Sequence, residues 1–82
     1  MEQHIYHYYI FHKKDLNLKQ KIQEFDCVEH TSIQVTIPVE REQLNMPDPH
    51  RSLVSITTIS DSSFKQLDEQ LTETFEEIWF KQ

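Results

Sequence analysis

The sequence of 82 residues contains no glycine. Glycine provides the positive φ angles and the close backbone approach on which several ligand-binding loops depend. Its absence excludes the glycine-rich phosphate loop, the dinucleotide-binding fingerprint and the glycine-flanked nucleophile elbow. The enzyme classes that are defined by these motifs are therefore excluded.

Cysteine and long apolar runs are also scarce. The single cysteine, Cys27, cannot form an internal disulfide, so nothing indicates an oxidising compartment. No window approaches the roughly 20 apolar residues that a membrane span requires. The N-terminal residues lack the basic and apolar regions of a secretory signal. These features predict a soluble, cytoplasmic protein without a membrane partner.

Acidic residues outnumber basic residues by 14 to 8, and the formal net charge is −6 with neutral histidines. Contacts from lysine and arginine to phosphates dominate the affinity of nucleic-acid-binding proteins. Lys13 and Lys14, beside the aromatic residues of the first segment, form only a weak basic patch. We therefore expect no direct contact with nucleic acid.

The N-terminal part of the chain predicts a strand and then a short helix. Residues 4–13 are rich in aromatic and β-branched types, as strands are. Neither face of this strand is plainly polar, which favours a central position in a sheet or an interface. Within residues 15–25, which carry an apolar helical stripe, Asn17 and Gln20 resemble a capping box, and Asp15 is an alternative cap. In the strand over residues 4–13, one face would carry Ile5, His7, Tyr9 and Phe11.

Two more strands are expected over residues 31–40 and 51–60. In the first of them, apolar and polar residues alternate. Pro38 has no backbone N–H, so this strand lies at a sheet edge or ends there. The connection over residues 41–50 is longer than most hairpin loops and is a candidate contact loop. In the strand over residues 31–40, one face would carry Ile33, Val35, Ile37 and Val39.

The last predicted element is a helix from about residue 60 to near the C-terminus. At helical spacing, one face is apolar and the opposite face is acidic. We expect Leu71 and Phe75 to be among the most buried residues and to face Val35 and Ile37. The apolar face would carry Phe64, Leu67, Leu71, Phe75, Ile78 and Trp79, and the acidic face Glu69, Glu73, Glu76 and Glu77.

Together these elements predict a single α+β domain over residues 1–82. Its three-stranded antiparallel or mixed sheet would have two helices on one face, with the third strand between the other two. The order β-α-β-β-α is like a ferredoxin-like fold lacking its last strand, and such a likeness does not imply a function. The open edge of the first strand favours a homodimer or a strand-edge contact.

Two histidines open predicted strands in a shared pattern, His30-x-Ser32 and His50-x-Ser52. The pattern resembles the paired motifs of the 2H phosphoesterase family. That resemblance implies histidines acting as general acid and base on a phosphodiester, with the hydroxyls holding its phosphate. In a hairpin the two histidines would lie near opposite ends, so such an enzyme would have to assemble its site across a dimer.

A metal site is not expected. Cys27-x-x-His30 has a plausible zinc-ligand spacing, but a four-ligand site requires a second pair of ligands. We predict neither a metal nor another cofactor.

We expect a small non-enzymatic protein that binds another protein with a basic surface. In size and charge it is like the inhibitors and regulators that phages encode, such as anti-CRISPR and immunity proteins, some of which cover nucleic-acid-binding grooves. Acidic residues near a helix C-terminus oppose the helix dipole, which favours a role in binding. The alternative is the phosphodiester-processing enzyme. The expected contact residues are Glu69, Glu73, Glu76, Glu77, Phe80, Tyr6, Tyr8, Leu44 and Met46.

Overall fold

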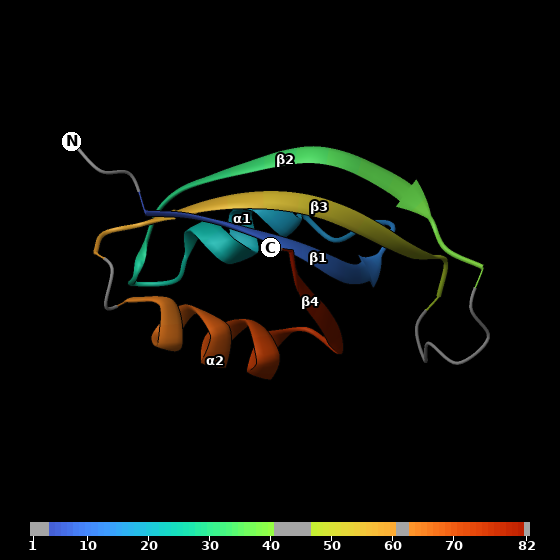
Figure 1. Ribbon diagram of the computed structural model, residues 1–82. Coiled ribbons are helices and arrows are strands. Elements are labelled where there is room, and N and C mark those ends of the chain that lie inside the picture. Colours follow the sequence, from blue (N-terminus) through green and yellow to red (C-terminus); the bar gives the residue numbers. More distant parts are fainter. Residues whose placement is uncertain (1–3, 41–46, 61–62, 82) are drawn as a thin grey trace.

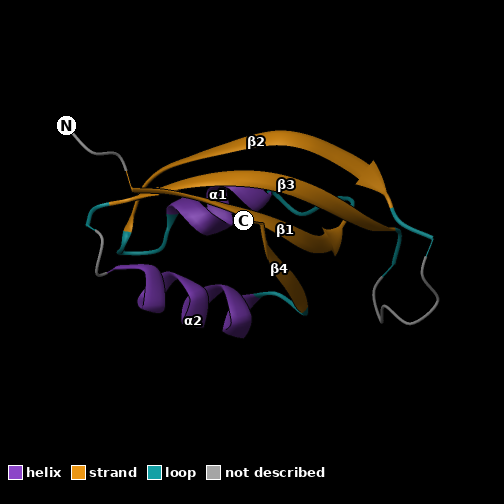
Figure 2. Cartoon of the chain, viewed as in Figure 1, coloured by secondary structure: helices purple, strands orange, loops and turns teal. Residues whose placement is uncertain are grey.

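A computed structural model describes residues 4–40, 47–60 and 63–81. Four strands form one antiparallel sheet in the order β2-β3-β1-β4. Both helices lie on the same side of this sheet (Figure 1, Figure 2). This connectivity is the complete ferredoxin-like arrangement. The elements are β1 (His4–Lys13), α1 (Leu18–Gln23), β2 (Val28–Pro38), β3 (Pro49–Thr58), α2 (Phe64–Thr74) and β4 (Glu77–Lys81).

The fourth strand corrects the prediction of a three-stranded sheet. β4 pairs with β1 over His7–Phe11, and β3 pairs with the other side of β1. β1 is therefore central, and the predicted open edge of the first strand is wrong. Two other expectations are confirmed: β3 lies between β1 and β2, and β2 is an edge strand that ends at Pro38.

The last helix is shorter than the sequence pattern indicated because the chain leaves it at Phe75. This residue has an extended backbone, with φ −114° and ψ 147°, and its N–H donates to the carbonyl of Leu71. The aromatic and β-branched residues that follow, Ile78-Trp79-Phe80, favour a strand. Their spacing also continues the helical stripe, and pairing with the edge of β1 decides between the two structures.

A β-bulge divides the apolar residues of β2 between the two faces of the sheet. Ile33 packs against the core, and the register with β3 shifts between Ile33 and Val35. Val35 and Ile37 then point away from the helices and are 50% and 38% exposed. The prediction that the last helix packs on these two residues is wrong, since one extra residue reverses the faces that follow it.

The core lies between the two helices and the covered face of the sheet. The expected burial of Leu71 and Phe75 is confirmed, and so is the helix start at Asn17, whose side-chain oxygen accepts from the N–H of Gln20 at 3.2 Å. Tyr8 ties β1 to α2, because its hydroxyl donates to Asp68 at 3.1 Å. The main core residues are Tyr8, Ile10, Leu18, Ile22, Val54, Ile56, Leu67, Leu71 and Phe75.

The hydrogen bond between Tyr8 and Asp68 predicts a loss of stability in alkali. Burial, and then the Asp68 carboxylate, raise the pKa of the Tyr8 phenol above its ordinary value. The phenol of the unfolded chain loses its proton first, near pH 10. This contribution to stability is therefore complete below about pH 9 and is lost as the pH rises further.

Tyr8→Phe should lower the free energy of unfolding by about 0.5–1.5 kcal/mol at pH 7. Between about pH 9 and 11 it should lose less stability than the wild type, because it lacks the titrating group. Urea unfolding at a series of pH values measures both effects, with Tyr9→Phe as the control for the loss of a tyrosine on the other face. Parallel pH profiles for the wild type and Tyr8→Phe would contradict the prediction.

Candidate functional site

The face of the sheet that the helices leave uncovered carries a row of large apolar side chains across all four strands. Strand register places Trp79 beside Tyr9, Tyr9 beside Leu53, and Leu53 beside Val35. Trp79 is 59% exposed and Val35 is 50% exposed. The outer face of an antiparallel sheet is usually polar, so a continuous apolar row there is typical of a contact surface.

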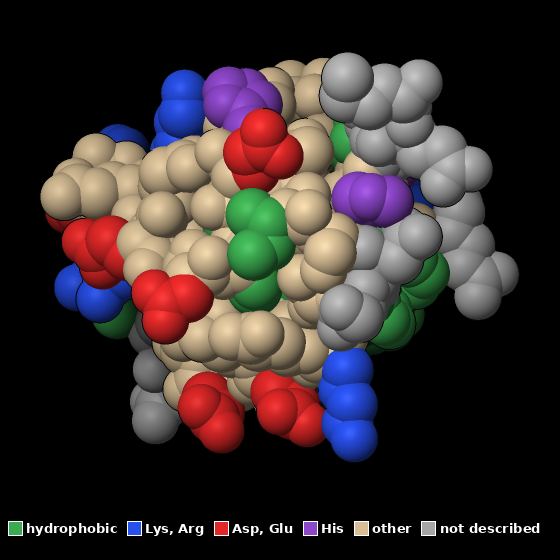
Figure 3. Space-filling model, turned by 90° about the vertical axis from the view of Figure 1, so that its left-hand side faces the viewer, with side chains coloured by type: hydrophobic (Ala, Val, Ile, Leu, Met, Phe, Trp, Pro, Cys, Tyr) green, Lys and Arg blue, Asp and Glu red, His purple; other side chains and the backbone are tan. Residues whose placement is uncertain are grey.

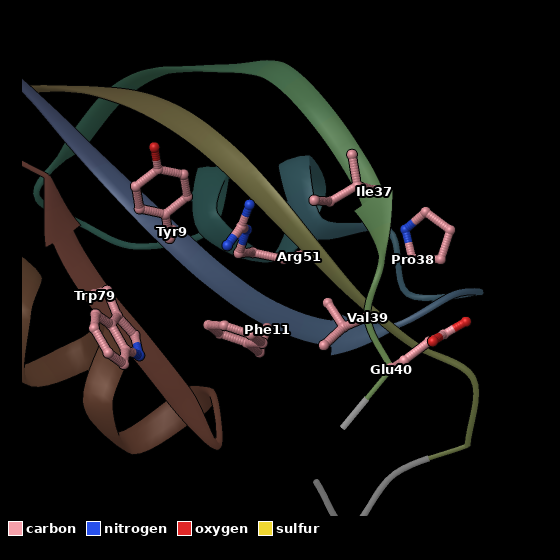
Figure 4. Close-up of a pocket in the computed structure, with 8 residues that line it drawn as sticks. All are labelled: Tyr9, Phe11, Ile37, Pro38, Val39, Glu40, Arg51 and Trp79. Atoms are coloured by element: carbon pink, nitrogen blue, oxygen red, sulfur yellow. The ribbon is translucent and has the colours of Figure 1, made fainter. Parts of the chain in front are cut away.

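A shallow pocket of about 530 Å³ adjoins this row (Figure 4). The guanidinium of Arg51 lies over the ring of Tyr9, 5.0 Å from its centroid, in a cation–π contact. We call the row and the neighbouring positions of the next row the open-face patch. It consists of Tyr9, Phe11, Val35, Ile37, Arg51, Leu53, Glu77 and Trp79, and Pro38, Val39 and Glu40 complete the pocket wall.

The carboxylate and the guanidinium of the patch lie on either side of Phe11 in one row. Phe11 pairs with Glu77 on β4 and with Arg51 on β3. The indole Nε1 of Trp79 donates to Oε2 of Glu77 at 3.0 Å. Among the described residues, no carboxylate forms an ion pair with Arg51, so its guanidinium keeps donors available to a partner.

The neighbouring part of the open face is polar. His7 Nδ1 lies 2.9 Å from Ser55 Oγ, and Gln34 Nε2 donates to Ser55 Oγ at 3.1 Å and to Ser32 Oγ at 3.4 Å. These groups satisfy one another and are solvated, as the outer face of a sheet usually is. The apolar character of the open face is thus concentrated in the patch.

A second serine–histidine pair is buried on the covered face. His12 Nε2 lies 2.6 Å from Ser52 Oγ, which lies 2.7 Å from Thr36 Oγ1, and His12 Nδ1 lies 2.9 Å from the Lys13 carbonyl. Because a carbonyl only accepts, His12 Nδ1 carries a proton, and with a neutral ring Ser52 donates to Nε2. Ser52, His12 and the Lys13 carbonyl thus follow the order of nucleophile, base and orienting group in a catalytic triad. Ser52 is only 1% exposed, so the network is structural.

The structure separates the two His-x-Ser motifs. His30 and Ser32 lie on the open face, whereas His50 and Ser52 lie on the covered face. His30 pairs with Thr57, seven residues from His50 along β3, or about 23 Å at a rise of about 3.3 Å per residue. The two histidines of one copy therefore cannot act on the same phosphodiester.

The predicted acidic stripe is not present on one helix. Glu69 and Glu73 belong to α2, but Glu76 follows its end and Glu77 begins β4. The prediction that these residues share a helical face is wrong, because the helix ends at Thr74. The end of the molecule seen in Figure 3 carries charges of both signs around a small hydrophobic area.

The aromatic residues predicted to bind a partner lie on the covered side. Phe80 is in β4, and its ring packs edge-on at 5.3 Å from both Tyr8 and Phe64. Tyr8 is fully buried, and Tyr6 packs on Phe64 at 4.9 Å. Tyr8 is thus a core residue, whereas Phe80 stays 44% exposed. The predicted contacts Leu44 and Met46 lie outside the described residues.

No group of three or more His, Cys, Asp or Glu side chains within residues 4–40, 47–60 and 63–81 could hold a metal ion. Cys27 is buried, its Sγ donates to Gln70 at 3.5 Å, and burial raises the pKa of its thiol. Neither described helix has the length and hydropathy that a bilayer crossing demands.

Comparison with known proteins assigns no relative. No protein-family model matches the chain, and no curated protein or solved structure matches it significantly.

The sequence predicts only some residues of the open-face patch to lie together. The alternation in β1 placed Tyr9 and Phe11 together on one face, as the structure has them. The helical spacing predicts Trp79 on a helix and the alternation predicts Val35 in the core, so the sequence pattern does not indicate the row. A short aromatic run after the last apolar helix turn was the signal that could have indicated β4.

The buried network predicts unequal effects of the same substitution on the two faces of β3. Ser52→Ala leaves His12 Nε2 and Thr36 Oγ1 without their partner and should lower the free energy of unfolding by about 1–3 kcal/mol. Ser55→Ala, on the open face, is the matched control and should cost less than about 0.5 kcal/mol. Denaturant unfolding compares the two variants, and equal losses would show that the network is not buried as described.

Proposed function

We propose that this chain is a small non-enzymatic protein-binding module and that it contacts a protein through the open-face patch. The observation that carries the proposal is the exposed apolar row from Trp79 to Val35. Four hydrogen-bonded strands hold this row in place, so little conformational entropy is lost when a partner covers it.

The residue types of the patch support protein binding. Tryptophan, tyrosine and arginine dominate the binding energy of protein interfaces when they are central and desolvated. Here Trp79 and Tyr9 are neighbours in one row, and Arg51 packs on the ring of Tyr9. Covering such a surface contributes roughly 25 cal/mol for each Å² of apolar area removed from water.

The charges favour a protein over a nucleic acid as the partner. The lysine and arginine residues of the strands are Lys13, Arg51 and Lys81, against the carboxylates of Glu29 and Glu77. This near balance, in a chain of net charge −6, gives a small electrostatic attraction for phosphates. Exposed aliphatic side chains at the β2 edge fit an apolar protein surface instead.

The finer proposal is that the module regulates or inhibits a protein partner by covering its surface. The net charge of −6 supports a partner with a basic surface, because complementary charge accelerates encounter. Such steering acts at long range and does not require the acidic residues to share one helical face.

Ile37→Asp tests the proposal, because it places a carboxylate in the pocket wall of the patch. Ile59→Asp is the matched control, since Ile59 is 63% exposed and follows the end of β3. Columns of the wild type and both variants are compared for the proteins they retain, a second copy of the chain included, and affinities are then measured with the purified partner.

We expect a partner that the wild type and Ile59→Asp bind alike and that Ile37→Asp binds at least about 10-fold more weakly. A partner whose affinity is equal for all three proteins would place its contact elsewhere and would refute the role of the patch. Circular dichroism confirms that each variant is folded.

A further inference from the structure

We infer that the protein seated on the open-face patch is a second copy of this chain, in a twofold dimer whose sheets pack face to face. The inference rests on the proposed function and names its partner. A twofold interface must be self-complementary, because each contact from one copy is repeated in reverse by the other. The arrangement of the patch can therefore be tested against that requirement residue by residue.

The row across the four strands matches itself when reversed. A twofold axis that lies between the two sheets, parallel to the strands and midway between β1 and β3, places β4 over the partner's β2 and β1 over the partner's β3. Trp79 of one copy then faces Val35 of the other, and Tyr9 faces Leu53. Each large aromatic ring meets a smaller aliphatic side chain, as interdigitation of packed sheets requires.

The same axis brings the charges of the patch together. In the next row, the order across the sheet is Glu77, Phe11, Arg51 and Ile37. Reversal of this row places Arg51 of one copy over Phe11 of the other, one strand away from Glu77. Two reciprocal pairs of Arg51 with Glu77 result. Arg51 has no ion pair with a described carboxylate of its own chain, so the contact supplies one.

The same axis also places the polar row of the open face against the polar row of the other copy without conflict. Its order is Lys81, His7, Ser55 and Ser32, so lysine meets serine and histidine meets serine across the interface. No carboxylate meets a carboxylate and no lysine meets a lysine. Like charges in contact would oppose association, and this pairing avoids them.

The open face is large enough for a small dimer. Four strands about 4.8 Å apart are about 19 Å wide, and a ten-residue strand is about 33 Å long at 3.3 Å per residue. Because β4 has five residues, the projected face is on the order of 550 Å², near the lower end of the roughly 600–1,000 Å² of accessible surface that each partner buries in a standard interface. In this dimer α1 and α2 lie outside, so Glu69 and Glu73 stay accessible to a further, basic protein.

Charge reversal in one and in both members of the pair tests the dimer. Arg51→Glu and Glu77→Arg each place two like-charged pairs in the interface and should raise the dimer dissociation constant about 10-fold or more. The double variant Arg51→Glu/Glu77→Arg restores opposite charges and should recover most of the lost affinity. Lys65→Glu, on the exposed side of α2, is the matched charge-reversal control and should remain a dimer.

Sedimentation equilibrium measures the dissociation constants, and the single tryptophan provides a second readout. Because Trp79 lies in the interface, its emission should shift to longer wavelength as the wild type is diluted into monomers. Circular dichroism establishes which variants are folded. If a single variant does not fold, the dilution-dependent emission of the wild type still tests the inference.

A wild type that is monomeric at several hundred micromolar, with emission independent of dilution, would overturn the inference. The proposed function would survive that result if a different protein still bound in a manner sensitive to Ile37→Asp, and would fall if none did. A dimer that both single variants weaken and the double variant does not restore would overturn the reciprocal pairing of Arg51 with Glu77.

Discussion

The pairing of β4 with the central strand β1 is the interaction on which the rest of the structure depends. It closes an edge of β1 that would otherwise present unpaired backbone groups. Successive side chains of a strand point to opposite faces, so the same five-residue strand supplies both layers. Ile78 packs against the core, and Trp79 joins Tyr9 on the open face.

The bulge in β2 also brings apolar side chains to the open face, at the opposite edge of the sheet. Without it, Val35 and Ile37 would follow Ile33 toward the helices, and the outer face of that edge would be polar. The bulge leaves Ile33 in the core and turns the later apolar residues outward. Two edge strands thus contribute the ends of the apolar row, and the central strands contribute Tyr9 and Leu53 between them.

The sheet carries the exposed apolar row and little of the acidic charge. Most of the described carboxylates lie on the helices and the connections, while the strands carry few. A face-to-face dimer would cover the open face and leave the helices outside. Self-association through the open face would therefore leave the exposed side chains of α1 and α2 accessible.

The sequence by itself determined the features that depend on neighbours within a few residues. These include the two faces of β1, the burial of Leu71, a start of α1 at Asn17 or Asp15, and an edge position or end of β2 at Pro38. Propensity, capping and alternation are local free energies, so a single sequence records them. The α+β class follows from the same local patterns.

Only the tertiary structure decided β4, the bulge and the register that assembles the open-face patch. Residues after Phe75 fit both a helical stripe and a strand, and the free edge of β1, some 70 residues earlier in the chain, selects the strand. Register depends on pairings between distant segments, and a one-residue shift exchanges the two faces. The row from Trp79 to Val35 exists because three such pairings agree, and no local pattern carries that information.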